Sequence, residues 1–432
     1  MAGGRFVVLG LAQARSPWFR AVAQWSNSAS IPVEFVKCMS PSELRAHLAS
    51  GRSFSALLVD GGLPGLDRDL VQETRDAGCA VLVVDDLRVS RDWRGLGANA
   101  VINPVLERKD LLDLLAEYAV EIGRADTVVE DEGPTAGVRR ARVAMVCGPG
   151  GTGASTAAIA LAQGLGDNPR YGGMVLLADL ALHAEQAMLH DARDVVPGIQ
   201  ELVDAFRTGR PGESDIRNLT FDVQERRYHL LLGLRRSRNW PAVRPRTFAA
   251  AFDGLVQSWH ALVCDCDADL EGEDDTGSID LEERNLMTRT AAAQADVVLC
   301  VGLPGMKGIH ALVRVVGDLL DHGVPAGRVV PVVNRAPKGA RQRAEITVAV
   351  AQLLRGRGSG DGLATPVFLP ERRVDEALRD MVRLPSALTA PLIGAFEAVT
   401  RRVGAGREAE ELRPVVPGTL GHWSADVTAE TA

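Results

Sequence analysis

The sequence is poor in lysine, in aromatic side chains and in long apolar runs. It has four lysines (Lys37, Lys109, Lys307 and Lys338) against forty-four arginines, and aromatic residues make up 4% of it. No apolar run approaches the roughly 20 residues that a membrane-spanning helix needs. The first residues lack a basic stretch before their short apolar run, which favours a first strand over a signal peptide. We therefore expect a cytoplasmic protein.

Patterns for metal binding and for disulfides are also lacking. The six cysteines include no C-x-x-C pair and mostly lie in apolar, strand-like runs, which favours buried reduced thiols. A net charge of −8 gives no global attraction to nucleic acid or to anionic lipid. With 432 residues, 46% of them hydrophobic, the chain is long enough for about two to three domains of roughly 150 residues each.

Residues 1–123 are predicted to form an α/β unit with a doubly wound parallel sheet. Short apolar runs alternate there with helical segments, which is the pattern of that fold. The strand candidates are residues 6–12, 33–39, 55–61, 80–86 and 99–104, and the clearest helical segments are 42–50, 68–78 and 108–122.

This unit resembles a response-regulator receiver domain, which is a flavodoxin-like fold. Asp60 ends the third strand, where a receiver carries its phosphoacceptor. A working receiver also needs an acidic pair after the first strand, but residues 10–12 are Gly, Leu and Ala, and Asn103 replaces the receiver's lysine before proline. The resemblance therefore implies a pseudo-receiver used for docking. A phosphorylatable Asp60 remains the alternative, and so does a plain loop aspartate.

Composition then divides the rest of the chain. Residues 124–140 are acidic, contain Gly-Pro and turn basic, as an interdomain linker does. Residues 404–432 contain prolines and no basic apolar face, so we expect a disordered tail without a membrane helix. Between them, residues 141–403 are predicted to form a second parallel sheet. Its strand candidates are residues 143–147, 173–180, 229–234, 260–267, 296–303 and 329–334.

A glycine-rich segment follows the first strand of this second domain. Gly148, Gly150, Gly151 and Gly153 permit positive φ and close backbone approach, so that successive N–H groups can face an anion at a helix N-terminus. Ser155 and Thr156 are expected to cap the helix. A phosphate loop of the form GxxxxGK[ST] places lysine directly after its last glycine, whereas here that residue is Ala154.

The segment resembles the deviant Walker A loop of MinD/ParA ATPases, roughly KGGxGK[ST]. On that pattern Pro149 stands at the early lysine, Thr152 at the variable position, Ala154 at the loop lysine and Ser155 at the magnesium-binding hydroxyl. Both lysines are therefore missing from a loop that keeps its glycines. The resemblance implies ATP with magnesium as the ligand, held weakly, and an enzymatic role is doubtful.

Three later strand ends carry further candidate residues. Asp179 follows the second strand, but Ala181 stands where the family usually has a second acid. Asp265 occupies the Walker B position and would help to hold magnesium through water; a solvent-facing acidic strand end is the alternative. The resemblance also implies that Asn334, followed by Arg335, meets the adenine.

The order of pseudo-receiver, linker and MinD-like domain resembles CpaE and TadZ, localisation factors of pilus systems, and related actinobacterial septum-site-determining proteins. This implies a scaffold with little or no ATP hydrolysis, whose partners are proteins of a pilus, secretion or division apparatus. A genuine ATP-dependent dimerisation switch, in which an arginine or Lys338 replaces the lost lysines, is the alternative. A third hypothesis is a partition-type DNA-binding module that uses the basic residues 226–246, although the acidic chain favours a solvated hairpin rim there.

Overall fold

The computed structural model describes residues 5–12, 16–28, 30–50, 52–85, 91–122, 140–355 and 362–408. Most of the predicted linker and the tail after residue 408 lie outside these ranges. The final helix continues to Glu408, past the expected start of the tail at residue 404. No helix among the described residues is long and apolar enough to cross a membrane.

The N-terminal unit is a five-stranded parallel sheet in the order β2-β1-β3-β4-β5. Helices α1 and α5 pack on one face of it, and α2, α3 and α4 on the other. The strands are apolar runs because helices cover both faces. The elements are β1 (Phe6–Leu11), α1 (Pro17–Asn27), β2 (Val33–Cys38), α2 (Pro41–Leu48), β3 (Ala56–Asp60), α3 (Arg68–Asp76), β4 (Ala80–Val84), α4 (Trp93–Leu96), β5 (Ala100–Ile102) and α5 (Arg108–Tyr118).

The second unit is an eight-stranded sheet in the order β13-β12-β11-β6-β10-β7-β9-β8. All its neighbouring strands are parallel except the edge pair β8–β9. Its strands are β6 (Arg142–Cys147), β7 (Val175–Asp179), β8 (Phe221–Val223), β9 (Tyr228–Leu231), β10 (Ala261–Asp265), β11 (Val297–Gly302), β12 (Val329–Ala336) and β13 (Val367–Pro370).

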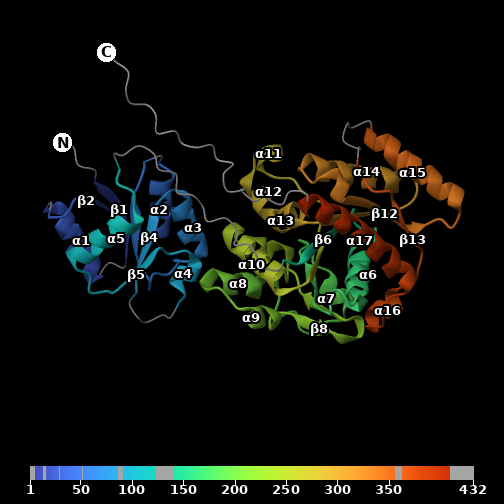
Figure 1. The fold of residues 1–432 in the computed structure, drawn as a ribbon, viewed down its shortest axis with the longest axis horizontal. Coiled ribbons are helices and arrows are strands. Elements are labelled where there is room, and N and C mark those ends of the chain that lie inside the picture. Colours follow the sequence, from blue (N-terminus) through green and yellow to red (C-terminus); the bar gives the residue numbers. More distant parts are fainter. Residues whose placement is uncertain are drawn as a thin grey trace, which may run out of the picture.

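Helices cover both faces of this sheet, in two separate apolar cores (Figure 1). One core contains α8, α10, α13, α14 and α15, and the other contains α6, α16 and α17. The helices are α6 (Ala154–Asp167), α7 (Gln186–Leu189), α8 (Ile199–Thr208), α9 (Glu213–Arg217), η1 (Gln224–Arg226), η2 (Ser237–Ala242), α10 (Pro245–Ser258), α11 (Glu273–Thr276), α12 (Ile279–Arg284), α13 (Leu286–Gln294), α14 (Met306–Asp321), η3 (Ala326–Arg328), α15 (Ala340–Arg355), α16 (Asp375–Arg379) and α17 (Ser386–Glu408).

The two units meet where α3 packs against α8 and α10 (Figure 1). The Arg68 guanidinium donates to the carbonyls of Phe206 (2.9 Å) and Gly209 (3.1 Å) at the C-terminal end of α8. Next to it, the Asp69 carboxylate accepts the Thr247 N–H in the first turn of α10. Arg68 and Asp69 are both buried, so the N-terminal unit supplies hydrogen-bond partners to the ends of two helices in the second unit.

The predicted α/β architecture with parallel sheets is confirmed, and the six cysteines are free and buried as expected. The two short strands β8 and β13 were not predicted from the sequence. The helical stretch ahead of β11 is divided at Asn285 into α12 and α13.

Candidate nucleotide site

The glycine-rich segment forms a tight loop between β6 and α6. Gly151 and Gly153 have φ values of 76° and 86°, in the left-handed region that favours glycine. A Cβ on Gly148 would lie 2.2 Å from the Val301 carbonyl oxygen. The turn is closed by Thr152, whose N–H and hydroxyl both donate to the Pro149 carbonyl, at 3.2 and 2.7 Å. The sequence of the loop therefore suits one backbone path.

The expected capping of α6 by Ser155 and Thr156 is wrong. Gly153 is the N-cap residue, Ala154 begins the helix, and no side chain caps it. Left-handed backbone at Gly153 sets the start of the helix two residues earlier than a Ser155 cap would. The first amides of a helix have no intrahelical acceptor. They are therefore left to face an anion, and the helix dipole favours negative charge there.

Asn334, at the end of β12, lies against this loop. Its side-chain amide donates to the Thr152 carbonyl at 2.8 Å. A Cβ on Gly153 would lie 2.5 Å from the Asn334 Nδ2, so glycine is needed for this approach. Arg335 follows with a φ of 52° and an exposed side chain. The structure thus brings the predicted adenine-side residues to the phosphate loop.

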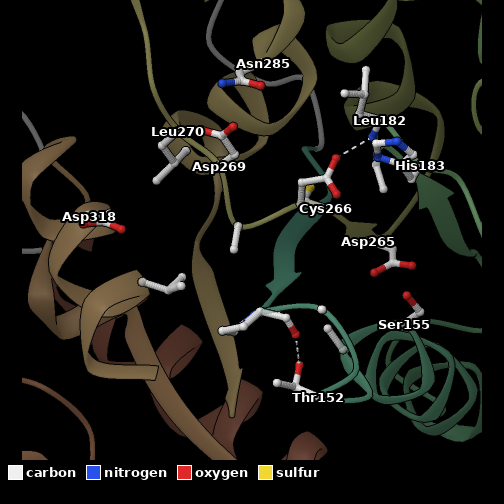
Figure 2. Close-up of a pocket in the computed structure, with 18 of the residues that line it drawn as sticks. Thr152, Ser155, Leu182, His183, Asp265, Cys266, Asp269, Leu270, Asn285 and Asp318 are labelled. Carbon is white, nitrogen blue, oxygen red and sulfur yellow. Dashed lines mark hydrogen bonds between the residues drawn. The ribbon is translucent and has the colours of Figure 1, made fainter. Parts of the chain in front are cut away.

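Asp179 and Asp265 end neighbouring strands and are partners in the register of β7 and β10. Both are buried. The Ser155 hydroxyl, at the start of α6, and the Asp265 carboxylate point toward each other in Figure 2, and the hydroxyl favours the ionised carboxylate. The serine and aspartate that the sequence assigns to magnesium are therefore adjacent.

Burial dominates the electrostatics of these two carboxyls. It raises the pKa of Asp265 to about 6, while hydrogen bonds from Gln186 and Ser155 oppose the rise and the charge of Asp267 adds to it. Burial and then the charge of Asp265 raise the pKa of Asp179 well above its ordinary value. Two buried carboxylates this close resist ionising together, so a cation between Ser155 and Asp265 would be favoured.

Gln186, the first residue of α7, contacts both carboxyls and was not identified from the sequence. Its backbone N–H donates to Asp179 at 2.9 Å, and its side-chain amide donates to Asp265 at 2.6 Å. It is completely buried, and its Oε1 has no hydrogen-bond partner among the residues that the structure describes. No motif marks this position, because its role depends on where α7 begins. The Leu182 N–H donates a hydrogen bond to the Asp267 carboxylate, which holds the preceding loop.

The oxygen donors in this site suit magnesium better than a metal whose ligands all come from the protein. No cluster of three or more His, Cys, Asp or Glu that could hold a metal occurs within the described ranges. Magnesium usually retains several waters and binds one or two carboxylates together with phosphate oxygens. Ser155 and Asp265 beside a phosphate loop, with the orphaned Gln186 Oε1 close by, provide this kind of environment.

The loop opens into a cleft of about 1320 Å³ at the carboxyl ends of β6, β7 and β10. Eight acidic side chains and four arginines line this cleft. The arginines are Arg284, Arg289, Arg314 and Arg335. Its acidic excess is unfavourable for a long polyanion such as DNA.

The basic stretch at residues 226–246 does not form a continuous cationic surface. Arg226 is fully buried and donates to the carbonyls of Ala377 and Val382. Arg235 pairs with Glu201. Arg246 pairs with Asp76 at 2.6 Å, across the contact between the units. These contacts remove three of the cations on which the DNA-binding hypothesis depends.

The receiver-type residues in the N-terminal unit form an ordinary strand end. Asp60 closes β3 and is buried, and its carboxylate accepts the Gly62 N–H at 3.2 Å. The first strand ends at Leu11 and is followed by Ala12, so it provides no carboxylate there to share a metal with Asp60.

No family model matches the sequence, and no curated protein matches it. Among solved structures, a ParA family ATPase from Chlorobium tepidum is similar at 16% identity, covering 59% of this chain and 98% of that chain, with a TM-score of 0.45. The cell division ATPase MinD of Pyrococcus furiosus is similar at 18% identity, over 60% and 99% of the two chains, with a TM-score of 0.44. A response regulator receiver protein from Pseudomonas putida is similar at 19% identity over 27% of this chain and 99% of that chain, with a TM-score of 0.22. Likenesses of this size carry no functional argument, so the proposals below depend on this chain's own residues.

Proposed function

We propose that the chain is a nucleotide-binding scaffold or localisation protein of the MinD/ParA type, arranged like CpaE and TadZ. On this proposal it holds ATP or ADP with magnesium weakly and hydrolyses ATP negligibly. Its partners are proteins of a pilus, secretion or division apparatus. The observation that carries the proposal is a phosphate loop with glycines that fix its path and with Pro149 and Ala154 at both lysine positions.

Binding relies on groups that remain in place. The uncapped amides at the start of α6 face the loop, and Ser155 and Asp265 lie together beside it. When bound, magnesium would neutralise phosphate charge that the missing lysines cannot. Asn334 at the loop provides an amide for the nucleotide base. These contacts are neutral or metal-mediated, so the proposal predicts low affinity and strong dependence on magnesium.

Hydrolysis requires more than binding. Losing one preorganised donor to the transition state costs about 2.7–4 kcal/mol, which is roughly 100- to 1000-fold in rate. Here two lysines are replaced, and Ala181 stands where a water-positioning acid is expected. Because each replacement removes stabilisation of the transition state, the combined loss leaves negligible turnover.

The test is to measure binding and turnover on the same preparation. Labelled ATP and ADP are titrated with and without magnesium, and phosphate release is followed with malachite green. The proposal expects magnesium-dependent binding and turnover near the blank. Turnover comparable to an intact family member, abolished by Asp265→Asn, would overturn it.

One observation favours the alternative, a nucleotide-dependent dimerisation switch. Arg314 on α14 and Arg335 after Asn334 line the same cleft and are exposed, and neither makes an ion pair within the described part of the chain. Either guanidinium is a candidate replacement for a lost lysine. Light scattering with MgATP tests this: a dimer that forms in the wild type but not in Arg335→Ala would support the switch. Arg341→Ala, on the exposed start of α15, is the control.

A further inference from the structure

We propose that Gln186 is a positioning residue that latches the cation site closed when no nucleotide is bound. The inference rests on the proposed function, since it concerns how magnesium and nucleotide reach Asp265. On this view the Gln186 side chain competes with the metal for the Asp265 carboxylate, and its release loosens the wall of the cleft.

Gln186 lies between the ends of the strands β7 and β10. The backbone N–H bonds to Asp179, and the side-chain Nε2 bonds to Asp265 at 2.6 Å. The same Nε2 lies 3.3 Å from the carbonyl oxygen of Ser155, in the first turn of α6. One fully buried residue therefore connects β7, β10 and the helix that follows the phosphate loop.

One atom of the Gln186 side-chain amide, the Oε1, is left without a hydrogen bond among the described residues. The Nε2 has two acceptors, whereas the Oε1 of the same amide is buried and finds no donor in the described part of the chain. A buried acceptor without a partner costs free energy that a satisfied amide does not. The closed arrangement is therefore held by the bond to Asp265 and opposed by the orphaned oxygen, so it can be displaced by a group that binds Asp265 better.

Displacing the Gln186 side chain from Asp265 would affect α7 and the segment before it. Gln186 begins α7, and the segment before it forms part of the cleft wall through Leu182, His183 and Glu185. If magnesium binds the Asp265 carboxylate, the side chain of Gln186 loses the shorter of its two hydrogen bonds and keeps only the one to the Ser155 carbonyl. Residues 182–189 then keep the hydrogen bond of the Gln186 N–H to Asp179 and that of the Leu182 N–H to Asp267. They lose the hydrogen bond between the Gln186 side chain and Asp265.

The experiment compares Gln186→Met with Gln163→Met in the full chain. Methionine keeps the length of the side chain and removes its hydrogen bonds. Gln163 is a matched control because it is also buried in this unit and bonds twice through its side chain, to the N–H and the carbonyl of Leu384. It lies on the far half of α6 and lines no part of the cleft.

The latch predicts that Gln186→Met lowers the magnesium concentration needed for half-maximal ADP binding, by about tenfold for a lost competing hydrogen bond. It also predicts faster amide exchange over residues 182–190 in the protein without nucleotide. Gln163→Met should change neither. A purely structural role for Gln186 would weaken ADP binding instead, because a disturbed site holds the metal less well.

The outcomes separate the two proposals. ADP binding by the wild type with no gain in Gln186→Met, or with unchanged exchange over residues 182–190, overturns the latch and leaves the proposed function standing. No magnesium-dependent binding of ADP or ATP by the wild type overturns the proposed function and, with it, the latch.

Discussion

Asp69 of the N-terminal unit accepts hydrogen bonds from both the N–H and the hydroxyl of Thr247 in the second unit. Thr247 lies in the first turn of α10, whose own N-cap residue, Arg244, provides no capping side chain. The N-cap function for α10 is thus supplied by another domain. Arg68 beside it bonds to carbonyls at the end of α8. The two units are held together by these helix-end contacts as well as by packing.

Replacing Asp69 by Ala should lower the free energy of unfolding of the full chain by about 1–3 kcal/mol, because it leaves buried donors at the start of α10 unpaired. Urea unfolding followed by circular dichroism measures this. Asp113→Ala, at an exposed position of α5, is the control. Equal stability of the two variants would show that the contact does not hold the units together.

Gly153 of the phosphate loop should not tolerate a side chain. Gly153→Ala places an L side chain in left-handed backbone and brings its Cβ within 2.5 Å of Asn334 Nδ2. Left-handed backbone costs about 1–2 kcal/mol for such a residue. We expect lower thermal stability and loss of nucleotide binding.

Gly150→Ala is the matched control for that variant, since a Cβ there meets nothing within 4 Å. It should retain the stability and the binding of the wild type. The same loss in both variants would mean that the loop tolerates no side chain anywhere, and that the backbone path at Gly153 is not the reason.

Asp265 should make the ligand-free protein less stable as the pH rises. Its pKa is raised to about 6 in the fold, above the value of about 3.9 for an unfolded chain. Its contribution to stability is therefore complete below about pH 4 and is lost as the pH rises through about 6. Asp265→Asn does not titrate, so it should exceed the wild type in stability by about 3 kcal/mol near neutral pH.

Near pH 3 that advantage should disappear, because Asp265 is then mostly protonated in both the folded and the unfolded state. Thermal unfolding without nucleotide across this range checks the sign. A stability advantage of Asp265→Asn that is the same at every pH, or no advantage at all, would contradict the raised pKa of the buried Asp265 carboxyl.

Restoring the lysine at position 154 should recover binding before it recovers chemistry. Ala154→Lys places an ammonium where it reaches the β- and γ-phosphates, and a hydrogen bond to a charged group is worth roughly 10- to 100-fold in affinity. Ala154→Met controls for side-chain length. Isothermal titration with MgATP should show tighter binding for the lysine variant alone, while turnover stays low because Pro149 and Ala181 are unchanged.

Asp60 should not accept a phosphoryl group. Its carboxylate is engaged with the Gly62 N–H, and the first strand provides no acid for a metal. Incubation with acetyl phosphate and magnesium, followed by intact-mass spectrometry, should leave the mass unchanged. A stoichiometric adduct at Asp60 would make the N-terminal unit a working receiver.

The sequence predicted the central strands well, because parallel strands covered on both faces are written as apolar runs. The short strands at the two edges of the second sheet were harder to predict. Strand β8 has three residues, and β13 four, and such short runs carry too little periodicity to be distinguished from loops. The start of α6 at Ala154 was misplaced because Ser155 and Thr156 have capping chemistry, whereas left-handed backbone at the N-cap residue Gly153 decided the boundary.

The candidate site was predicted in part. Residues in one loop, such as Gly148 to Ser155, are adjacent in the chain, and Asp179 and Asp265 could be placed by strand register. Gln186 could not be, because its contacts depend on the path of the loop between β7 and α7. Arg68 and Asp69 likewise resemble an ordinary solvated helix start, and only the tertiary structure shows them buried against α8 and α10.

The most direct test of the central claim is a titration of labelled ATP and ADP into the full chain with magnesium, with phosphate release followed in parallel. The account predicts weak, magnesium-dependent saturation by both nucleotides and no release above the blank. Tight binding accompanied by steady turnover would contradict it, and so would the absence of any binding.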